Sequence, residues 1–214
     1  MHAKGTCKRY FIFLAGAFIC AIGIGFISRA ALGSSPLSGV PFVLHLSTGR
    51  QMGVFTFATN MLFLVLETVL RRRFGWYQVL QIGAAVAFSY CIDFALWAIP
   101  TQVDGNLAMK LLYLVVGCFV MALGIALEVF GDVLILPGEG FVQVLADKTG
   151  WKFGNAKVGL DCVLTLAAAT LSLFTFRRFN GVGVGTVISA LVVGQLVNLY
   201  SRKLEKLSGW ISTK

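Results

Sequence analysis

Six long apolar runs constrain this chain more than any other feature. A helix needs about 20 mostly apolar residues to cross the hydrocarbon core of a bilayer, and each run is close to that length. Only 13% of the 214 residues are charged, which is about half the usual share in a soluble domain. The sequence therefore predicts an all-α integral membrane protein embedded in a lipid bilayer. The six expected spans cover roughly residues 10–30, 53–71, 76–99, 108–130, 154–175 and 182–201.

The formal net charge of +9 comes from basic residues that flank these runs. Lys8 and Arg9 precede the first run, Arg71–Arg73 follow the second, and Arg202 with Lys203 ends the last. Lys and Arg that flank spans tend to stay in the cytoplasm, so the sequence favours cytoplasmic N- and C-termini. Arg177 and Arg178 would then lie outside, which counts against this orientation. Because the basic residues are accounted for by their places at span ends, we expect no nucleic-acid partner.

The chain repeats itself after a shift of 101 positions. Punctuating Gly and Pro residues recur in register, which indicates one unit used twice. The unit spans residues 10–99 and 108–203, so we expect a single membrane domain, 1–214, with two repeats. Because each unit holds three spans, the second should be inverted in the membrane, as in many transporters. The matching pairs are Gly16 and Gly117, Gly23 and Gly124, Pro36 and Pro137, Gly39 and Gly140, Gly49 and Gly150, and Gly53 and Gly154.

A short broken element follows the first span of each unit. Residues 31–36 can descend about 20 Å as extended chain, and a helix from Leu37 to Ser47 can then climb back about 16 Å. Pro36 suits the first turn of such a helix. We therefore predict a re-entrant half-helix in each repeat, and the two positive N-terminal ends should meet near the membrane centre.

The glycine-rich first span, "LGSSPLSGVP", "GDVLILPGEG" and the repeated Thr-Gly…Gly spacing carry a family resemblance. Over about residues 10–203 the chain resembles the bacterial YczE/YyaS/YitT-type integral membrane proteins. The resemblance implies a multi-spanning protein of the bacterial cytoplasmic (inner) membrane. It brings no settled substrate and no catalytic residues.

Glu139 is the strongest candidate functional residue because it replaces Ser38 of the first repeat beside a predicted half-helix N-terminus. It could bind a cationic group or a proton, since ionisable residues inside a membrane are expensive and usually functional. It could equally be an acid that only stabilises the helix end. Asp132 and Glu128 either line the path or lie in water at the cytoplasmic mouth.

Lys157 and Asp161 lie one helical turn apart in the fifth span, where the first repeat has Thr56 and Asn60. They either contribute to a central site or form a simple helix ion pair, with Lys157 extending outward to the membrane surface. Ser34 and Ser35 either donate hydroxyls to a ligand or satisfy loop backbone. The full predicted substrate-binding set is Ser34, Ser35, Ser38, Gly39, Asn60, Asp132, Gly138, Glu139, Gly140, Lys157 and Asp161.

Other polar residues inside spans have a simpler explanation. Asp93 and Asn198, which lie at similar places in the two repeats, can join helices by hydrogen bonds, and so can Gln81. The glycines of the first and fourth spans allow close helix packing. The sequence contains no P-loop, nucleophile elbow or His/Cys metal cluster. We therefore expect no enzyme activity, no cofactor and no bound metal.

These features favour a small secondary transporter, proton-coupled or not, that carries a small polar or charged solute between Pro36–Gly39 and Pro137–Gly140. Glu139, with Asp132 or Asp161, would bind a cationic group or a coupling proton. Three alternatives stay open: a passive solute channel, a substrate-binding subunit that needs an energy-coupling partner, and a non-transporting scaffold. A homo-oligomer or a partner membrane protein is compatible with each.

Overall fold

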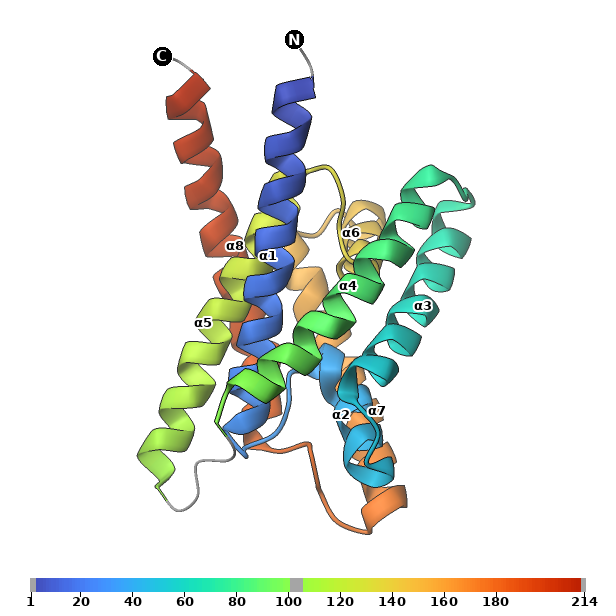
Figure 1. Ribbon diagram of the computed structural model, residues 1–214, viewed down its shortest axis with the longest axis vertical. Coiled ribbons are helices and arrows are strands. Elements are labelled where there is room, and N and C mark those ends of the chain that lie inside the picture. The colour runs from blue at the N-terminus through green and yellow to red at the C-terminus, as the bar shows by residue number, and fades with distance from the viewer. Residues whose placement is uncertain (1–2, 101–105, 213–214) are drawn as a thin grey trace.

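The computed structural model describes residues 3–100 and 106–212, without the side chains of 3–7, 205 and 207–212. Within this part of the chain every regular element is a helix, and the two termini lie at the same end of the bundle (Figure 1). The eight helices are α1 (Ala3–Arg29), α2 (Pro36–Thr48), α3 (Met52–Arg71), α4 (Trp76–Ala98), α5 (Leu107–Gly131), α6 (Pro137–Thr149), α7 (Phe153–Phe176) and α8 (Val184–Ser212).

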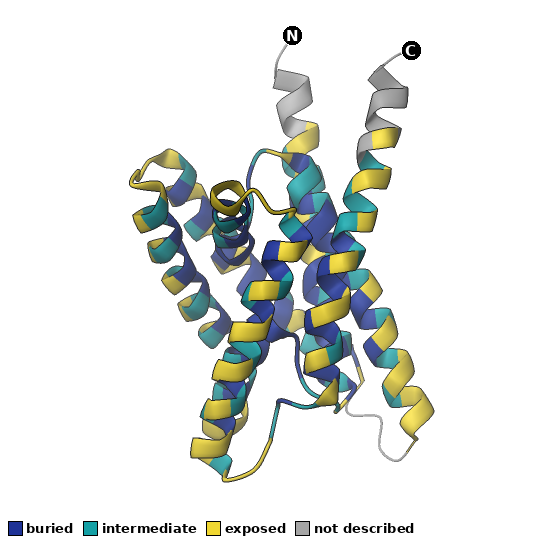
Figure 2. Cartoon of the chain, turned by 180° about the vertical axis from the view of Figure 1, so that it is seen from behind, coloured by how far each residue is buried: buried dark blue, intermediate teal, exposed yellow. Residues whose placement is uncertain are grey.

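Six of these helices are long and apolar enough to cross a membrane, which confirms the six predicted runs. Exposed residues follow the outward faces of the long helices, while buried residues gather between them (Figure 2). Large apolar side chains such as Phe11, Leu62 and Phe174 are exposed. An apolar outer surface of this kind suits lipid as its solvent.

Helices α1 and α5 form the central contact of the bundle, and they cross closely because both carry glycines. A Cβ added to Gly16 would lie 2.8 Å from the carbonyl oxygen of Gly124. Likewise, a Cβ added to Gly117 would lie 3.0 Å from the carbonyl oxygen of Gly23. The sequence predicted this packing role for small residues. Gly117 and Gly124 are the counterparts, 101 positions on, of Gly16 and Gly23, so the second contact repeats the first with the two helices exchanged. Helices α1 and α5 run in opposite directions (Figure 1).

Each short helix packs on a long helix from the other half of the chain. Helix α2 lies against α7, and α6 lies against α3. Val43 of α2, for example, is buried beside Ala168 of α7. The long helices also pair within their own half: α4 lies against α1 and α3, and α8 lies against α5 and α7. The two halves are therefore interlocked through their short helices.

Backbone conformations also recur at equivalent positions. The non-glycine residues with left-handed φ in the described chain are Ala31, Arg72, Asp132 and Arg177. Ala31 (φ 55°) and Asp132 (φ 48°) are 101 positions apart and end the turns after α1 and α5. Side-chain caps recur as well, because Asp93 accepts from the Gly53 N–H at 2.8 Å and Asn198 accepts from the Gly154 N–H at 3.0 Å. The helix-joining role expected for Asp93 and Asn198 is confirmed.

Candidate functional site

The N-terminal ends of α2 and α6 meet inside the bundle. Pro36 and Pro137 occupy the first turns of the two helices, where a missing N–H costs nothing. Both first turns are buried, whereas the last residues of both helices are exposed. A Cβ added to Gly138 would lie 2.7 Å from Cδ2 of Leu37. Two helix ends with partial positive charge therefore come into contact at one buried place.

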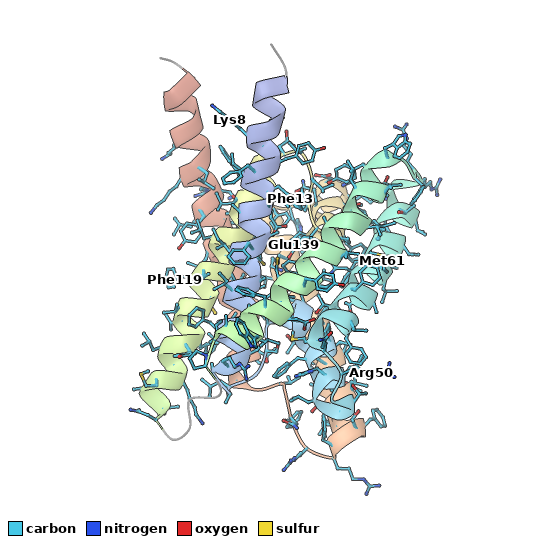
Figure 3. All side chains as sticks on the ribbon, in the orientation of Figure 1. Lys8, Phe13, Arg50, Met61, Phe119 and Glu139 are labelled. Carbon is cyan, nitrogen blue, oxygen red and sulfur yellow. The ribbon has the colours of Figure 1, made fainter. Side chains whose placement is uncertain are left out.

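Three ionisable side chains predicted as site residues come together beside these ends. Glu139 lies in the first turn of α6, and Lys157 and Asp161 lie on α7. The Lys157 Nζ is 3.5 Å from Asp161 Oδ1 and 4.0 Å from Glu139 Oε1. Their side chains are at most 2% exposed. Lys157 forms the expected ion pair with Asp161, but it does not extend to the membrane surface. Figure 3 places Glu139 near the middle of the bundle.

Glu128 of α5 is a fourth member of this cluster. The alternative that placed it in water is wrong, because its side chain is fully buried. Neither carboxyl oxygen makes a side-chain hydrogen bond among the described residues, and the group lies near the Leu136 backbone, Glu139 and Lys157. If all were ionised, three carboxylates would face one ammonium. Buried charge without a counter-charge is strongly unfavourable, so this cluster favours an added proton or cation.

Asp132 lies outside the cluster, which corrects its place in the predicted set. Its side chain is 79% exposed, and its Oδ2 is 3.4 Å from Arg9 Nη2 at the surface. Helix α5 ends at Gly131, and the left-handed turn at Asp132 directs this side chain to the surface before the chain returns inward. Asp tolerates this conformation better than most residues.

The remaining predicted residues surround the two helix ends. The Ser34 N–H donates to Thr186 Oγ1 at 3.1 Å, whereas the hydroxyls of Ser34 and Ser35 are buried without a described partner. Asn60 Oδ1 accepts from the Gly138 N–H at 3.3 Å, so it caps the end of α6. Gly39 instead packs against Ala168, with 3.0 Å between an added Cβ and the alanine Cβ. A cavity of about 10 Å³ touches Ser38 and Asn60.

Another buried acid, Glu67 of α3, was missed by the sequence analysis. Its Oε1 accepts from Arg71 Nε at 2.9 Å, and its Oε2 accepts from Gln81 Nε2 at 3.0 Å. Gln81 also donates to the carbonyl of Ile135 at 3.1 Å, which ties down the loop before α6. The available signal was an acid one helical turn before Arg71 within an otherwise apolar span. Gly140 lies directly against this group, so α6 links Glu67 to Glu139.

Larger cavities lie away from the cluster. One of about 330 Å³ is lined by Arg29, His45 and Asp93, among others, at the end opposite the termini. The central cluster itself is closed. No group of three His, Cys, Asp or Glu side chains in the described residues could hold a metal ion.

Comparisons with known proteins identify a membrane-protein relative and a family. The chain is 20% identical over 190 residues to the "Uncharacterized membrane protein YczE" of Bacillus subtilis (strain 168), which covers 88% of this chain and 83% of the relative. No solved structure matches. A family model described as "Family of unknown function (DUF6198)" matches residues 7–202. The YczE-type resemblance is thereby confirmed, and this multi-spanning membrane protein belongs to the DUF6198 family.

Proposed function

We propose that this chain is a small secondary transporter of the bacterial cytoplasmic membrane that carries a small polar or charged solute. The solute would bind where the first turns of α2 and α6 meet. The single observation that carries the proposal is the buried cluster of Glu139, Lys157 and Asp161 beside these two helix ends. Buried ionisable groups are costly in a membrane, and they usually belong to substrate or proton pathways.

The proposed architecture is a pair of inverted repeats, each with a re-entrant half-helix. Its support is that equivalent residues make equivalent contacts: Gly16 with Gly124 and Gly117 with Gly23. The two short helices have buried N-terminal and exposed C-terminal ends, as a re-entrant helix would. Transporters built in this way bind substrate at the interface of the repeats and move one repeat against the other.

The site can bind two kinds of group. The positive ends of the two helices and Lys157 suit an anionic group, while Glu139 and Glu128 suit a cationic group or a coupling proton. The closed packing around the cluster favours a carrier that must open over a channel that stays open. The excess of Lys and Arg at the end with the termini supports a cytoplasmic location for that end.

The test is ligand-induced thermal stabilisation of the purified protein in detergent. Wild type is compared with Glu139→Gln and with Asp132→Asn, a matched control that neutralises an exposed acid. The screen covers small anions, amines, amino acids and vitamins at two pH values. A ligand at 100 times its Kd stabilises a protein by about 2.7 kcal/mol, which corresponds to a shift of roughly 5–11 °C for a chain of this size.

We expect a ligand that stabilises wild type and Asp132→Asn but not Glu139→Gln, with all three folded. Saturable counterflow of that ligand in proteoliposomes would then identify a carrier, whereas unsaturable flux would indicate a channel. A ligand that stabilises Glu139→Gln as well as wild type would place the site elsewhere. If no ligand shifts the wild type and Glu139→Gln is only less stable, Glu139 is a helix-end residue and the proposal is wrong.

A further inference from the structure

A pocket of about 360 Å³ lies between α7 and α8, away from the buried cluster. It opens at the start of α7 and near the C-terminal part of α8, at the end of the bundle that holds both termini. Two of its lining residues are basic, three are amides and none is acidic. The lining residues are Lys152, Asn155, Gln195, Asn198, Leu199 and Arg202.

The amides of this pocket are already organised. Asn198 Oδ1 accepts from the Gly154 N–H, and its Nδ2 lies 3.3 Å from Asn155 Oδ1 as a donor. Gln195 Nε2 also donates to Asn155 Oδ1, at 3.5 Å. Lys152 and Arg202 have no ion-pair partner among the described side chains. Among the described side chains, the pocket therefore presents two cations without an acidic partner above a fixed amide layer, beside the positive N-terminal end of α7.

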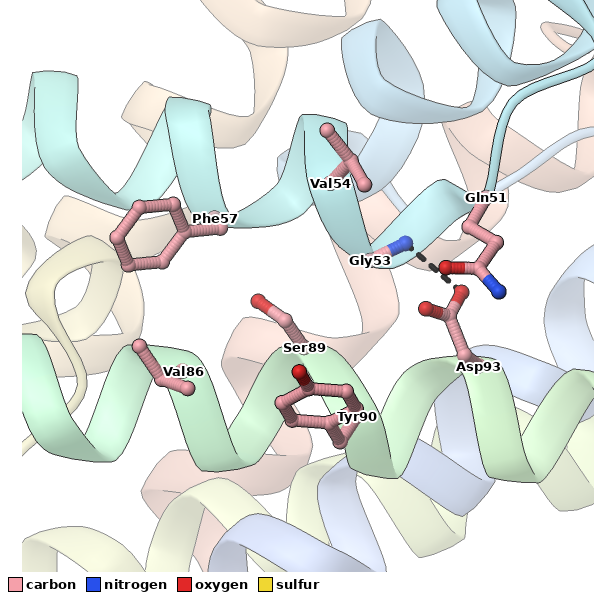
Figure 4. A pocket seen from close by; sticks show the side chains of 8 residues that line it. All are labelled: Gln51, Gly53, Val54, Phe57, Val86, Ser89, Tyr90 and Asp93. Carbon is pink, nitrogen blue, oxygen red and sulfur yellow. Dashed lines mark hydrogen bonds between the residues drawn. The ribbon is translucent and has the colours of Figure 1, made fainter.

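The equivalent groove in the first half has the opposite character. Figure 4 shows this groove between α3 and α4, where Asp93 accepts the hydrogen bond from Gly53. Its volume is about 250 Å³. Gln51 is equivalent to Lys152 of the second half. In the same way, Tyr90 is equivalent to Gln195, and Asp93 is equivalent to Asn198. The two halves thus share the backbone arrangement, but only the groove between α7 and α8 has a net positive charge. The internal repeat therefore does not explain why Lys152 and Arg202 are there.

The face of α8 that lines the pocket changes character along its length. Leu191, Gln195, Asn198 and Arg202 follow at helical spacing, so they share one stripe. Leu191 is exposed and lies toward the middle of the span, whereas Arg202 lies at the end with the termini. A lipid has the same order, with an anionic phosphate at the surface and acyl chains below it. A soluble phosphate would not use the apolar part.

We propose that this pocket, lined by Lys152 and Arg202 over the amides of Asn155 and Asn198, binds the phosphate of an anionic membrane lipid. Basic pockets between transmembrane helices are suited to acidic headgroups, and each cation near the surface contributes to the attraction. The acyl chains lie along the stripe that leads to Leu191. This site is independent of the proposed transport site.

Native mass spectrometry of the full chain in neutral detergent tests the assignment, with phosphatidylglycerol as the probe and phosphatidylcholine as the zwitterionic comparison. Wild type is compared with Lys152→Gln/Arg202→Gln and with Arg73→Gln/Lys203→Gln. The second double variant removes the same charge from exposed positions at the same end. We expect phosphatidylglycerol to bind the pocket variant about 30-fold more weakly than wild type, and the control variant within about 3-fold. Lys152→Arg should retain binding, since it keeps the charge.

Two results would overturn this site. Equal weakening in both double variants would mean that phosphatidylglycerol responds only to the overall charge. Equal binding of phosphatidylcholine and phosphatidylglycerol to wild type would show that the negative headgroup is not recognised. A third arm uses inorganic phosphate in a thermal-shift assay. Stabilisation by phosphate that depends on Lys152 and Arg202, without preferential lipid binding, would assign the pocket to a soluble anion and contradict the lipid assignment.

Discussion

Single residues make the two halves chemically different although they share one plan. Lys157 and Asp161 stand in α7 where α3 has Thr56 and Asn60. The neutral pair hydrogen-bonds within its own helix and caps α6, because Asn60 reaches both Thr56 and Gly138. The charged pair instead forms a buried ion pair and reaches Glu139. At these two positions, the first half thus has neutral side chains that form structural hydrogen bonds, whereas the second half has charged side chains.

This difference can be tested by exchanging the residues between the repeats. We expect Lys157→Thr alone to destabilise the fold by about 3–5 kcal/mol, because it leaves carboxylates buried without their ammonium partner. The double variant Lys157→Thr/Asp161→Asn, which restores the neutral pair of the first half, should recover only part of that loss, because Glu139 and Glu128 stay buried without the ammonium group. Reversible unfolding in detergent, measured for both single variants and the double variant, gives the coupling between the two positions. Additive effects would show that the ion pair is not a unit.

Sequence reasoning found Glu139, Lys157 and Asp161 because an acid or a lysine within an apolar span is conspicuous. It placed Asp132 in the site and missed Glu67, and both errors have one cause. The depth of an acid near the end of a span depends on whether a neighbouring element covers it. Helix α6 and Gln81 cover Glu67, whereas nothing among the described residues buries Asp132.

At the scale of elements, α6 is held in place by its contact with α3 and α4. Gly140 makes this possible because its backbone lies against the Glu67 carboxylate and the Gln81 amide. An added Cβ would lie 2.9 Å from Gln81 Nε2 and 3.0 Å from Glu67 Cδ. The small residue therefore sets how closely α6 approaches, and with it the position of Glu139.

Gly140→Ala should destabilise the protein by about 1–3 kcal/mol, because the extra methyl group forces the Glu67 network apart. Gly83→Ala in α4 is the matched control, since an added Cβ there meets nothing within 4 Å. It should be neutral or stabilising by about 0.5–1 kcal/mol, as is usual for glycine inside a helix. Thermal unfolding of both variants measures the difference. Equal midpoints would mean that α6 has room to shift.

Element boundaries were largely predictable from sequence. The expected short helix, Leu37–Ser47, differs from α2 by one residue at each end, because Pro36 and Gly49 punctuate it. The partner of each short helix was not predictable. An apolar residue such as Val43 does not indicate which long helix will cover it. That α2 packs on α7 and α6 packs on α3 is therefore known only from the tertiary structure.

At the scale of the whole molecule, the proposed inversion makes a prediction about topology. Arg72 and Arg177 are equivalent left-handed residues at the ends of α3 and α7. In inverted repeats they must face opposite sides of the membrane. Single cysteines at these positions, in a background without the five native cysteines, should therefore react differently with a membrane-impermeant maleimide in intact cells. We expect labelling at position 177 and, only after permeabilisation, at position 72.

Labelling of both positions from the same side would contradict inversion, and the reverse pattern would place the termini outside. Thermal stability of each cysteine variant close to that of wild type is the control for a native fold. Exposed positions are suitable because substitutions there rarely change stability by more than about 0.5 kcal/mol.

The exchange of short helices also bears on how the chain is made. Val43 and Ala168 pack together although they are 125 positions apart. At about 5–20 residues per second, translation needs roughly 6–25 s between them. During that interval α3 can already lie against α2, but the part of α7 that covers Val43 does not yet exist. Release from the ribosome before α7 is complete would leave a half-built protein with this face of α2 unshielded, so biosynthetic timing as well as equilibrium packing decides how much functional protein a cell obtains.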